Sequence, residues 1–418
     1  MTTTNVKTLW MKRLLLCALW WHLFSNAVNK NVVELSNVFS LVPDLLLVFL
    51  MLSDVIRLEK TGLRAAMWSV YVMVGTCLLG LVVNSSSIFN FAWGYRCSYL
   101  QIAALFVTAS LCTLRDFHKL FEYLYYFFIL DLLLAVYQYV VLGYYQDLNN
   151  GAFMGGAGQD FFCAAVFAYH YYMYIEKKCP IKKVAFIFAG CVLIAVLEEE
   201  KFIFIELAGI VAYQTLVSKF SVVRLALLIL VVIGLSYGID YMGEVNGQDT
   251  STLTDINSFV EYAQMVGYGY ELPRVGSSVY IEKMFFHDDA NVLFGLGLGM
   301  CEDSSLSLVD TSFFERHGWL NYFYFPFQIG FLQTGWVGVI SFLALFVIMI
   351  VQQWKSMLKA PRGMKAYHHI TIVLSFIAIG TYWYNGTLRL GNALLPYVVL
   401  AIGFVANKYY KSNGVRCI

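Results

Sequence analysis

Long apolar runs dominate this chain and restrict what it can fold into. Hydrophobic residues make up 60% of its 418 residues, and charged residues make up only 13%. The runs are roughly 16–24 residues long, close to the length that a helix needs to cross a bilayer. Helices are expected because lipid cannot satisfy open backbone hydrogen-bonding groups. The sequence therefore predicts an all-α integral membrane protein with about twelve transmembrane helices, at 9–27, 38–56, 64–83, 97–114, 121–143, 159–175, 183–197, 200–217, 222–241, 327–351, 368–386 and 390–407.

Positive charges are distributed unevenly between the two sides that these helices define. With the N-terminus placed in the cytoplasm, 21 of the 28 Lys and Arg residues fall on the cytoplasmic side. Because inner loops of membrane proteins carry an excess of Lys and Arg, this asymmetry predicts an even number of spans and two cytoplasmic termini. The formal net charge of +1 gives no indication of a nucleic-acid partner.

One external segment is much longer than the other loops. Residues 242–326 are rich in Asp, Ser, Gly and Asn and follow nine predicted helices in residues 1–241. We expect this segment to fold against the helix ends, because it is too long for a simple connector. Within it we predict short helices at Ser251–Val266 and Ser277–Phe286, and a transmembrane helix that starts near Pro326. Three helices in residues 327–418 complete one membrane domain.

Four cations on the outer side stand out. They are Lys201, Arg274, Arg316 and Arg389, which lie in short outer turns or in the long loop. Taken singly, a cation at an outer helix end is usually a surface charge that reaches toward the headgroups. Taken together, planar guanidinium groups and an ammonium group suit the oxygens of a phosphate. We therefore predict that the four side chains form a cradle for an anionic headgroup such as a lipid diphosphate.

Two candidate bases lie beside these cations in the sequence. His317 follows Arg316, and a cationic neighbour favours the neutral imidazole that can accept a proton from a hydroxyl. Glu199 lies in a run of three glutamates that ends before Lys201, and it is the alternative base. A hydrogen-bonding loop histidine and solvated turn carboxylates are the simpler interpretations of the same residues.

Two further motifs in the long loop give no indication of a cofactor. His287, Asp288 and Asp289 have no other ligand at a useful spacing, so a polar helix end is favoured over a metal site. The glycines of 295–299 lack the strand–turn–helix context of a dinucleotide-binding fingerprint. We expect these glycines to let another backbone segment approach closely. The sequence predicts neither a metal nor a cofactor.

Several segments in a fixed order resemble the signature of a known family. Arg274 is followed by a mostly apolar helix, by LFGLGLG, by His317 and by FQIGFLQTGWVGVISFLALF. Upstream of them lie GAFMGGAGQDFFCAAVFA and EEEKFIFIELAGI. This order, from about residue 150 to residue 345, resembles the bacterial O-antigen polymerase and O-antigen ligase superfamily of Wzy-type membrane glycosyltransferases.

The resemblance implies a GT-C-like helical fold in the bacterial inner membrane. It also implies an inverting, metal-independent transfer of a glycan from undecaprenyl diphosphate at the periplasmic face. Arg274 is similar to the family's diphosphate-binding arginine, His317 is similar to its loop histidine, and Lys201 takes the place of an arginine. We expect a polysaccharide polymerase of the O-antigen or capsule type, with membrane lipid and a chain-length regulator protein as further partners.

Three alternatives stay open at this point, one of which is a non-catalytic scaffold in a polysaccharide-export complex. An O-antigen ligase would use the same donor but would transfer the glycan to a lipid A core sugar. A transporter of lipid-linked glycans would belong to another class, and it should show inverted repeats or cations deep in the bundle. The sequence shows no such repeat, and its candidate cations lie at the outer edge.

Overall fold

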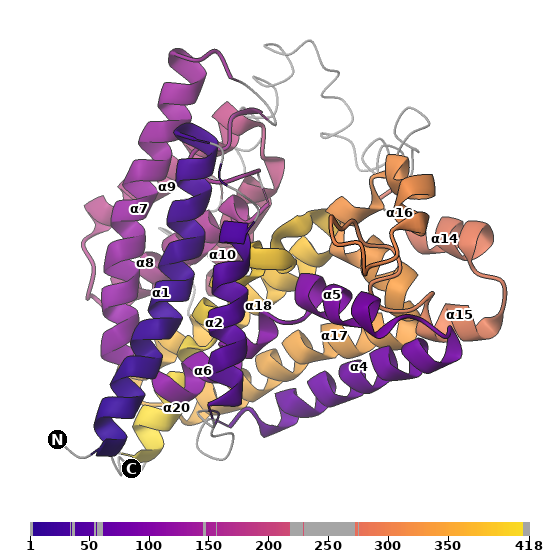
Figure 1. The fold of residues 1–418 in the computed structure, drawn as a ribbon. Helices are drawn as coiled ribbons and strands as arrows, with labels where there is room; N and C mark the ends of the chain where they lie inside the picture. Colours follow the sequence, from indigo (N-terminus) through magenta and orange to yellow (C-terminus); the bar gives the residue numbers. More distant parts are fainter. Residues whose placement is uncertain are drawn as a thin grey trace.

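The computed structural model describes residues 3–33, 35, 38–53, 56, 62–144, 148–155, 157–217, 229, 272–274 and 276–412. These residues form an all-helical protein in which no β-strand occurs (Figure 1). The α-helices are α1 (Thr3–Asn31), α2 (Val38–Leu52), α4 (Arg64–Val83), α5 (Ile88–Ser98), α6 (Ile102–Leu111), α7 (Leu114–Val140), α8 (Gln159–Ile175), α9 (Ile181–Glu198), α10 (Lys201–Val217), α14 (Ser277–Phe285), α15 (Asp289–Phe294), α16 (Ser312–His317), α17 (Pro326–Lys359), α18 (Arg362–Tyr384), α19 (Leu394–Leu400) and α20 (Ile402–Ser412). Short 3₁₀ turns are η3 (Gly318–Leu320), η4 (Tyr322–Tyr324), η5 (Gly386–Leu388) and η6 (Leu390–Ala393).

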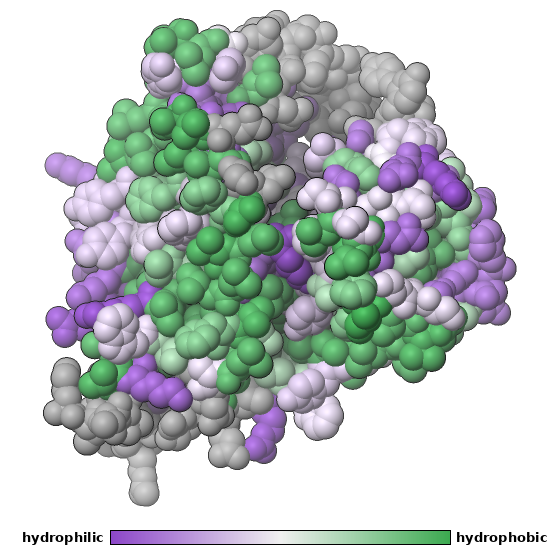
Figure 2. All heavy atoms as spheres, viewed as in Figure 1, coloured by the Kyte–Doolittle hydropathy of each residue, from purple (hydrophilic) through white to green (hydrophobic). Residues whose placement is uncertain are grey.

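Four helical segments of the described chain are long and apolar enough to cross a membrane. They are Arg64–Val83, Leu114–Val140, Pro326–Lys359 and Leu390–Tyr409. Figure 2 shows broad apolar surface over α1, α2 and α4, where large side chains such as Trp10, Phe49 and Trp68 are exposed. An exposed apolar surface of this extent is favourable against lipid and unfavourable against water. The fold is therefore that of an all-helical membrane protein.

Several predicted spans differ from the helices that form. Residues 97–114 are not one helix, because the chain turns at Tyr99–Gln101 between α5 and α6. Helix α17 is broken at Gly335, which has φ 58° and ψ −165°, and residues 390–407 are divided among η6, α19 and α20. Apolar composition continues through each of these breaks, so hydropathy alone cannot locate them. The predicted span 222–241 and the predicted helix Ser251–Val266 lie outside the described residues, apart from Ile229.

Predicted inner segments come together at one end of the bundle. Helix α1 begins and α20 ends at this end, which is the lower one in Figure 1. The ammonium of Lys12 lies 2.8 Å from a carboxylate oxygen of Asp116, and Lys178 donates to the carbonyl of Gly363 at 3.2 Å. Lys408 donates to the carbonyl of Ser110 at 2.5 Å. The contacts join segments that the charge pattern assigns to one side.

Predicted outer segments meet at the opposite end. The amide of Asn31, at the end of α1, donates to the carbonyl of Gly151 at 3.0 Å, and Gln138 of α7 donates to the same carbonyl at 2.7 Å. The backbone N–H of Gly158 donates to the hydroxyl of Thr387 at 3.0 Å, which joins the start of α8 to η5. This end of the bundle therefore contains the beginning of α8 and the end of α18.

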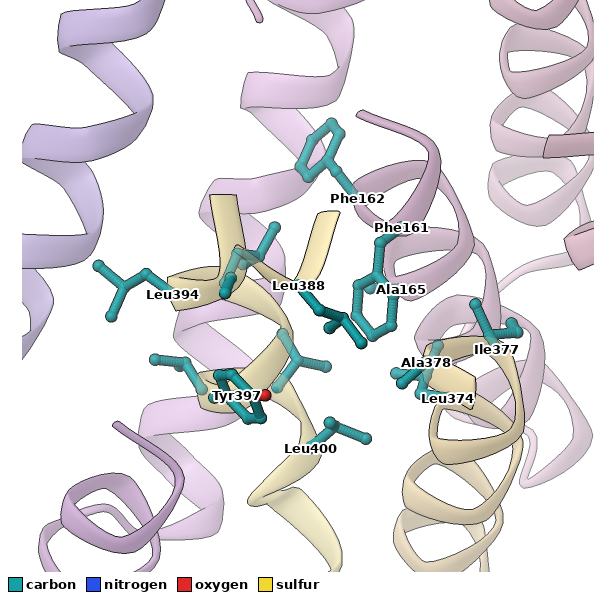
Figure 3. Packing of buried hydrophobic residues seen from close by; sticks show 14 of the residues in the cluster. Phe161, Phe162, Ala165, Leu374, Ile377, Ala378, Leu388, Leu394, Tyr397 and Leu400 are labelled. Atoms are coloured by element: carbon teal, nitrogen blue, oxygen red, sulfur yellow. The ribbon is translucent and has the colours of Figure 1, made fainter. Parts of the chain in front are cut away.

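The core between α8, α18 and α19 holds this outer end in place. Figure 3 shows Phe161 and Ala165 of α8 facing Leu374 and Ala378 of α18, all of them buried. Leu388, Leu394, Tyr397 and Leu400 pack beside them and are at most 1% exposed. Close packing of this kind fixes the positions of the turns at the ends of the same helices.

The glycine-rich run of 295–299 makes close backbone contacts. The backbone N–H of Leu296 donates to the carbonyl of Leu332 at 2.8 Å, and the backbone N–H of Gly297 donates to the carbonyl of Gln333 at 3.1 Å. Gly299 has φ 85°, and a Cβ placed there would overlap the carbonyl of Asn90 in α5. The expectation that these glycines permit close backbone approach is confirmed. They join the long loop to α5 and to the region of α17 that precedes its break.

Replacing Gly299 by alanine is expected to lower the free energy of unfolding by about 2 kcal/mol or more. The side chain would meet the Asn90 carbonyl, and the positive φ is unfavourable for alanine. Thermal unfolding in detergent, followed by helical circular dichroism, measures the effect. Gly209→Ala in α10 is the matched control, because a Cβ added at Gly209 would meet no atom within 4 Å and should cost no stability. Equal melting temperatures for both variants would contradict this account.

Candidate functional site

The turn between α9 and α10 places an acidic and a basic side chain side by side. Helix α9 ends at Glu198, and Glu199 adopts the left-handed conformation with φ 58°. Helix α10 begins at Lys201, so only Glu199 and Glu200 separate the two helices. The backbone N–H of Lys201 donates to the carbonyl of Glu199 at 3.0 Å. Both side chains are partly buried. The Lys201 ammonium therefore lies in the electric field of the Glu199 carboxylate.

Arg274 of the long loop reaches the same end of the bundle. Its guanidinium lies over the ring of Phe325 at 5.2 Å and over the ring of Tyr384 at 4.9 Å, measured to the ring centroids. Contacts between a cation and two aromatic rings hold a guanidinium in a defined plane. Arg274 is therefore held against the end of α18.

Tyr384 connects Arg274 to Lys201. The ring of Tyr384 stacks on Phe202, the residue after Lys201, with a centroid distance of 4.4 Å. Lys201 and Arg274 interact electrostatically, and so do Glu200 and Tyr384. We refer to Lys201, Arg274, Glu199, Glu200 and Tyr384 together as the cation site. In the described part of the chain, neither cation of this site forms a salt bridge within 4 Å.

Asp160 fixes the segment that follows Tyr384. Its carboxylate accepts hydrogen bonds from the backbone N–H of Phe161 at 2.7 Å, the hydroxyl of Thr387 at 2.9 Å and the amide of Asn385 at 2.5 Å. The carboxylate is fully buried. Because these bonds join α8 to the end of α18, they hold Tyr384 in place beside Arg274.

Arg389 has a different environment from the other predicted cations. It is only 6% exposed, and its guanidinium donates to both carboxylate oxygens of Glu302 at 2.6 Å. It also donates to the carbonyl of Phe323 at 2.5 Å, while Gln333 donates to Glu302 at 3.1 Å. Its charge is compensated by Glu302, so the geometry gives Arg389 a structural role between the long loop and η6. We therefore do not count Arg389 among the side chains that bind the anionic headgroup.

Arg316 and His317 lie on α16, away from the contacts of the cation site. Arg316 is exposed, and the ring of His317 packs against Phe285 at 5.0 Å and Phe313 at 4.8 Å. Partial burial and the neighbouring Arg316 lower the pKa of His317. The contacts found among the described residues join neither side chain to Lys201 or Arg274. The structure therefore brings together Lys201, Arg274 and Glu199 of the six predicted site residues.

The alternative metal ligands form a helix cap. Asp288 accepts a hydrogen bond from the backbone N–H of Asn291 at 2.8 Å and caps the N-terminus of α15, as expected for a polar helix end. Over the described residues, no group of three His, Cys, Asp or Glu side chains is placed to hold a metal ion.

Two important residues of this region carry no clear signal in the sequence. Tyr384 falls within an apolar predicted span, and Glu302 is one of several acidic residues in the long loop. Each becomes important through a partner far away in the chain, Arg274 for Tyr384 and Arg389 for Glu302. The aromatic residues that directly precede the outer turn at Asn385 are the available signal for Tyr384.

The fold and the site define a class, an all-helical membrane protein with two cations held together at the end opposite to its described termini. Searches with protein-family models and among curated proteins found no match to this chain.

Proposed function

We propose that this protein is a membrane glycosyltransferase, a polysaccharide polymerase that transfers a glycan from undecaprenyl diphosphate to a lipid-linked acceptor. In this proposal the chain crosses the bacterial inner membrane twelve times, both termini are cytoplasmic, and the reaction takes place at the periplasmic face. The order of motifs between residues 150 and 345 supports the family, and the distribution of Lys and Arg supports the orientation.

The observation that carries the proposal is the meeting of Lys201 and Arg274. Two cations that repel each other at a partly buried site favour an anionic ligand between them. A diphosphate fits this requirement, because the guanidinium can bind two oxygens at once and the ammonium can bind a third. Glu199 interacts with Lys201 and Glu200 interacts with Tyr384, so carboxylates near the cations are available to accept the proton of the acceptor hydroxyl.

The reaction then follows from these positions. The acceptor oxygen attacks the anomeric carbon, the bond from this carbon to the diphosphate oxygen breaks, and the configuration at the carbon inverts. The diphosphate leaves with the bonding electrons, and its charge is stabilised by Lys201 and Arg274. A base takes the hydroxyl proton. Glu199 is favoured for this role over His317, because Glu199 lies beside Lys201 whereas His317 packs between Phe285 and Phe313.

The direct test uses purified protein in lipid with undecaprenyl-diphosphate-linked repeat units and a chelator. We expect a ladder of longer glycans, with free undecaprenyl diphosphate as the second product. Transfer to a lipid A core acceptor without any ladder would identify the ligase reaction instead. Movement of intact donor across sealed vesicles without new glycosidic bonds would identify a transporter.

The dependence of the rate on pH separates the two candidate bases. If His317 is the base, activity is lost as the pH falls through its pKa, which Arg316 helps to lower. Arg316→Ala would then raise this pKa and move the acidic limb of the rate profile to higher pH. We expect no such movement, because Glu199 is the favoured base. Arg362→Ala removes a cation at the opposite end of the molecule and is the control for a general effect of charge. If the acidic limb of the rate profile shifts in Arg316→Ala but not in Arg362→Ala, His317 is the base.

A further inference from the structure

A group of buried carboxyl side chains lies behind the cation site. Asp131 of α7, Asp160 of α8, Glu198 of α9 and Glu206 of α10 are each at most 3% exposed. These four helices pack against one another in the bundle (Figure 1). Ionisable groups are expensive to bury in a membrane protein, and they usually have a function. Asp160 is accounted for by its hydrogen bonds to the end of α18, whereas Glu198 and Glu206 each keep at least one carboxyl oxygen without a donor among the described residues.

One amide joins two of these carboxyl groups. The side-chain nitrogen of Gln159 donates to Asp131 at 3.0 Å and to Glu198 at 2.9 Å. Asp131 also accepts from the backbone N–H of Ala152 at 2.7 Å. Gln159 is fully buried, so its amide group has used both of its hydrogens on two acceptors.

The site contains more hydrogen-bond acceptors than donors. The second oxygen of Glu198 and the side-chain oxygen of Gln159 are buried, and no hydrogen-bond donor of the described residues lies within reach of them. Burying an ionised carboxylate oxygen that has no donor is costly, and a proton on the carboxyl group lowers that cost.

The surrounding charges do not replace the missing donor. The charged and titratable groups that face Glu198 are Lys30 of α1, Asp131 of α7, Cys163 of α8 and Glu200 of the turn before α10. Lys30 is the one cation among them, and it forms no hydrogen bond to Glu198 within the described residues. Burial, followed by the charge of Asp131, raises the pKa of Glu198 well above its usual range. The surroundings therefore favour a carboxyl group that carries its proton.

We propose that Asp131, Gln159 and Glu198 form a proton-binding site that holds one proton, shared between the two carboxyl groups, at neutral pH. The role of this site in catalysis rests on the proposed function. Glu200 of the cation site interacts electrostatically both with Glu198 and with Tyr384, so it links the cation site to the proton-binding site. In glycan transfer Glu199 takes the hydroxyl proton, which then passes by way of Glu200 to the carboxylate of the pair that is still ionised, and the pair becomes neutral. The proton later returns to water, which restores the resting state.

Infrared spectroscopy of the purified protein tests the bound proton without any need for enzyme activity. At neutral pH, Glu198→Gln is expected to remove absorption of a protonated carboxyl group, which shifts in heavy water. In Asp131→Asn the absorption band of a protonated carboxyl group should remain at neutral pH. As the pH is raised, this band should disappear at a lower pH than in the unmodified protein, because the charge of the neighbouring carboxyl group is gone. Glu122→Gln, which changes an exposed carboxylate of α7, should remove carboxylate absorption alone. Loss of carboxylate absorption alone in Glu198→Gln, with no change in titration in Asp131→Asn, would overturn the proposal.

The assay of polymer formation tests the catalytic role separately. Glu198→Gln is expected to slow elongation about a hundredfold at neutral pH, whereas Glu122→Gln should not slow it. An unchanged rate in Glu198→Gln would overturn the role in proton transfer and leave the bound proton in place. If the unmodified protein makes no polymer, the proposed function fails, while the infrared result still decides whether the proton is bound. Both substitutions preserve side-chain size, and elution as a folded protein in detergent confirms that each variant can be compared.

Discussion

Replacing Arg274 by alanine is expected to lower the rate of glycan transfer by about two to three orders of magnitude. The guanidinium is held between two rings beside Lys201, at the position proposed for the diphosphate of the donor. Charge on that diphosphate increases as the glycosidic bond breaks, so a fixed cation stabilises the transition state more than the bound donor. The loss should therefore appear mainly in kcat, measured with purified protein and lipid-linked repeat units.

Two further variants make this result specific. Arg274→Lys keeps the positive charge but loses the planar contact with Phe325 and Tyr384, and an intermediate rate is expected. Lys283→Ala removes an exposed cation from α14 in the same loop and should leave the rate unchanged. A rate for Arg274→Ala close to that of the unmodified protein, at equal expression in the membrane, would remove Arg274 from the mechanism.

Replacing Arg389 by alanine is expected to cost about 3–5 kcal/mol of stability. The substitution would leave Glu302, which is 4% exposed, as an uncompensated buried charge. It would also remove the bond to the Phe323 carbonyl, which joins η6 to the segment before α17. Thermal unfolding in detergent should show a large decrease in melting temperature.

A double substitution separates the charge from the packing. Arg389→Met combined with Glu302→Met removes both charges, so it should be much less destabilising than Arg389→Ala alone. Lys12→Ala breaks the more exposed ion pair with Asp116, and we expect a cost of about 1 kcal/mol or less. If Arg389→Ala unfolds at the same temperature as Lys12→Ala, the buried pair does not stabilise the fold.

The parts of the fold that could be predicted are those with local signals. Gly276, in the left-handed conformation, precedes α14, which the sequence predicts at Ser277–Phe286 and which forms at Ser277–Phe285. Pro326 is the first residue of α17, where its missing N–H costs nothing. Apolar composition predicts helices throughout, because a membrane protein must satisfy its backbone within each segment.

The parts that could not be predicted depend on distant partners. Placing Lys201 and Arg274 on the same side follows from the charge pattern, but their meeting depends on Tyr384, 110 residues beyond Arg274. The sequence groups Arg389 with them because it contains no sign that Glu302 neutralises this cation. Hydropathy reports the length of apolar segments and carries no information on which helix ends become neighbours.

Binding of undecaprenyl diphosphate, the leaving group itself, tests the central claim most directly. Its affinity for the purified protein in lipid should be measured for the unmodified protein, Lys201→Met, Arg274→Met and the double variant. The account predicts that each single substitution weakens binding at least tenfold, and that the two effects are not additive because both cations hold the same ligand. Equal affinities in all four proteins would show that these two side chains do not hold the diphosphate.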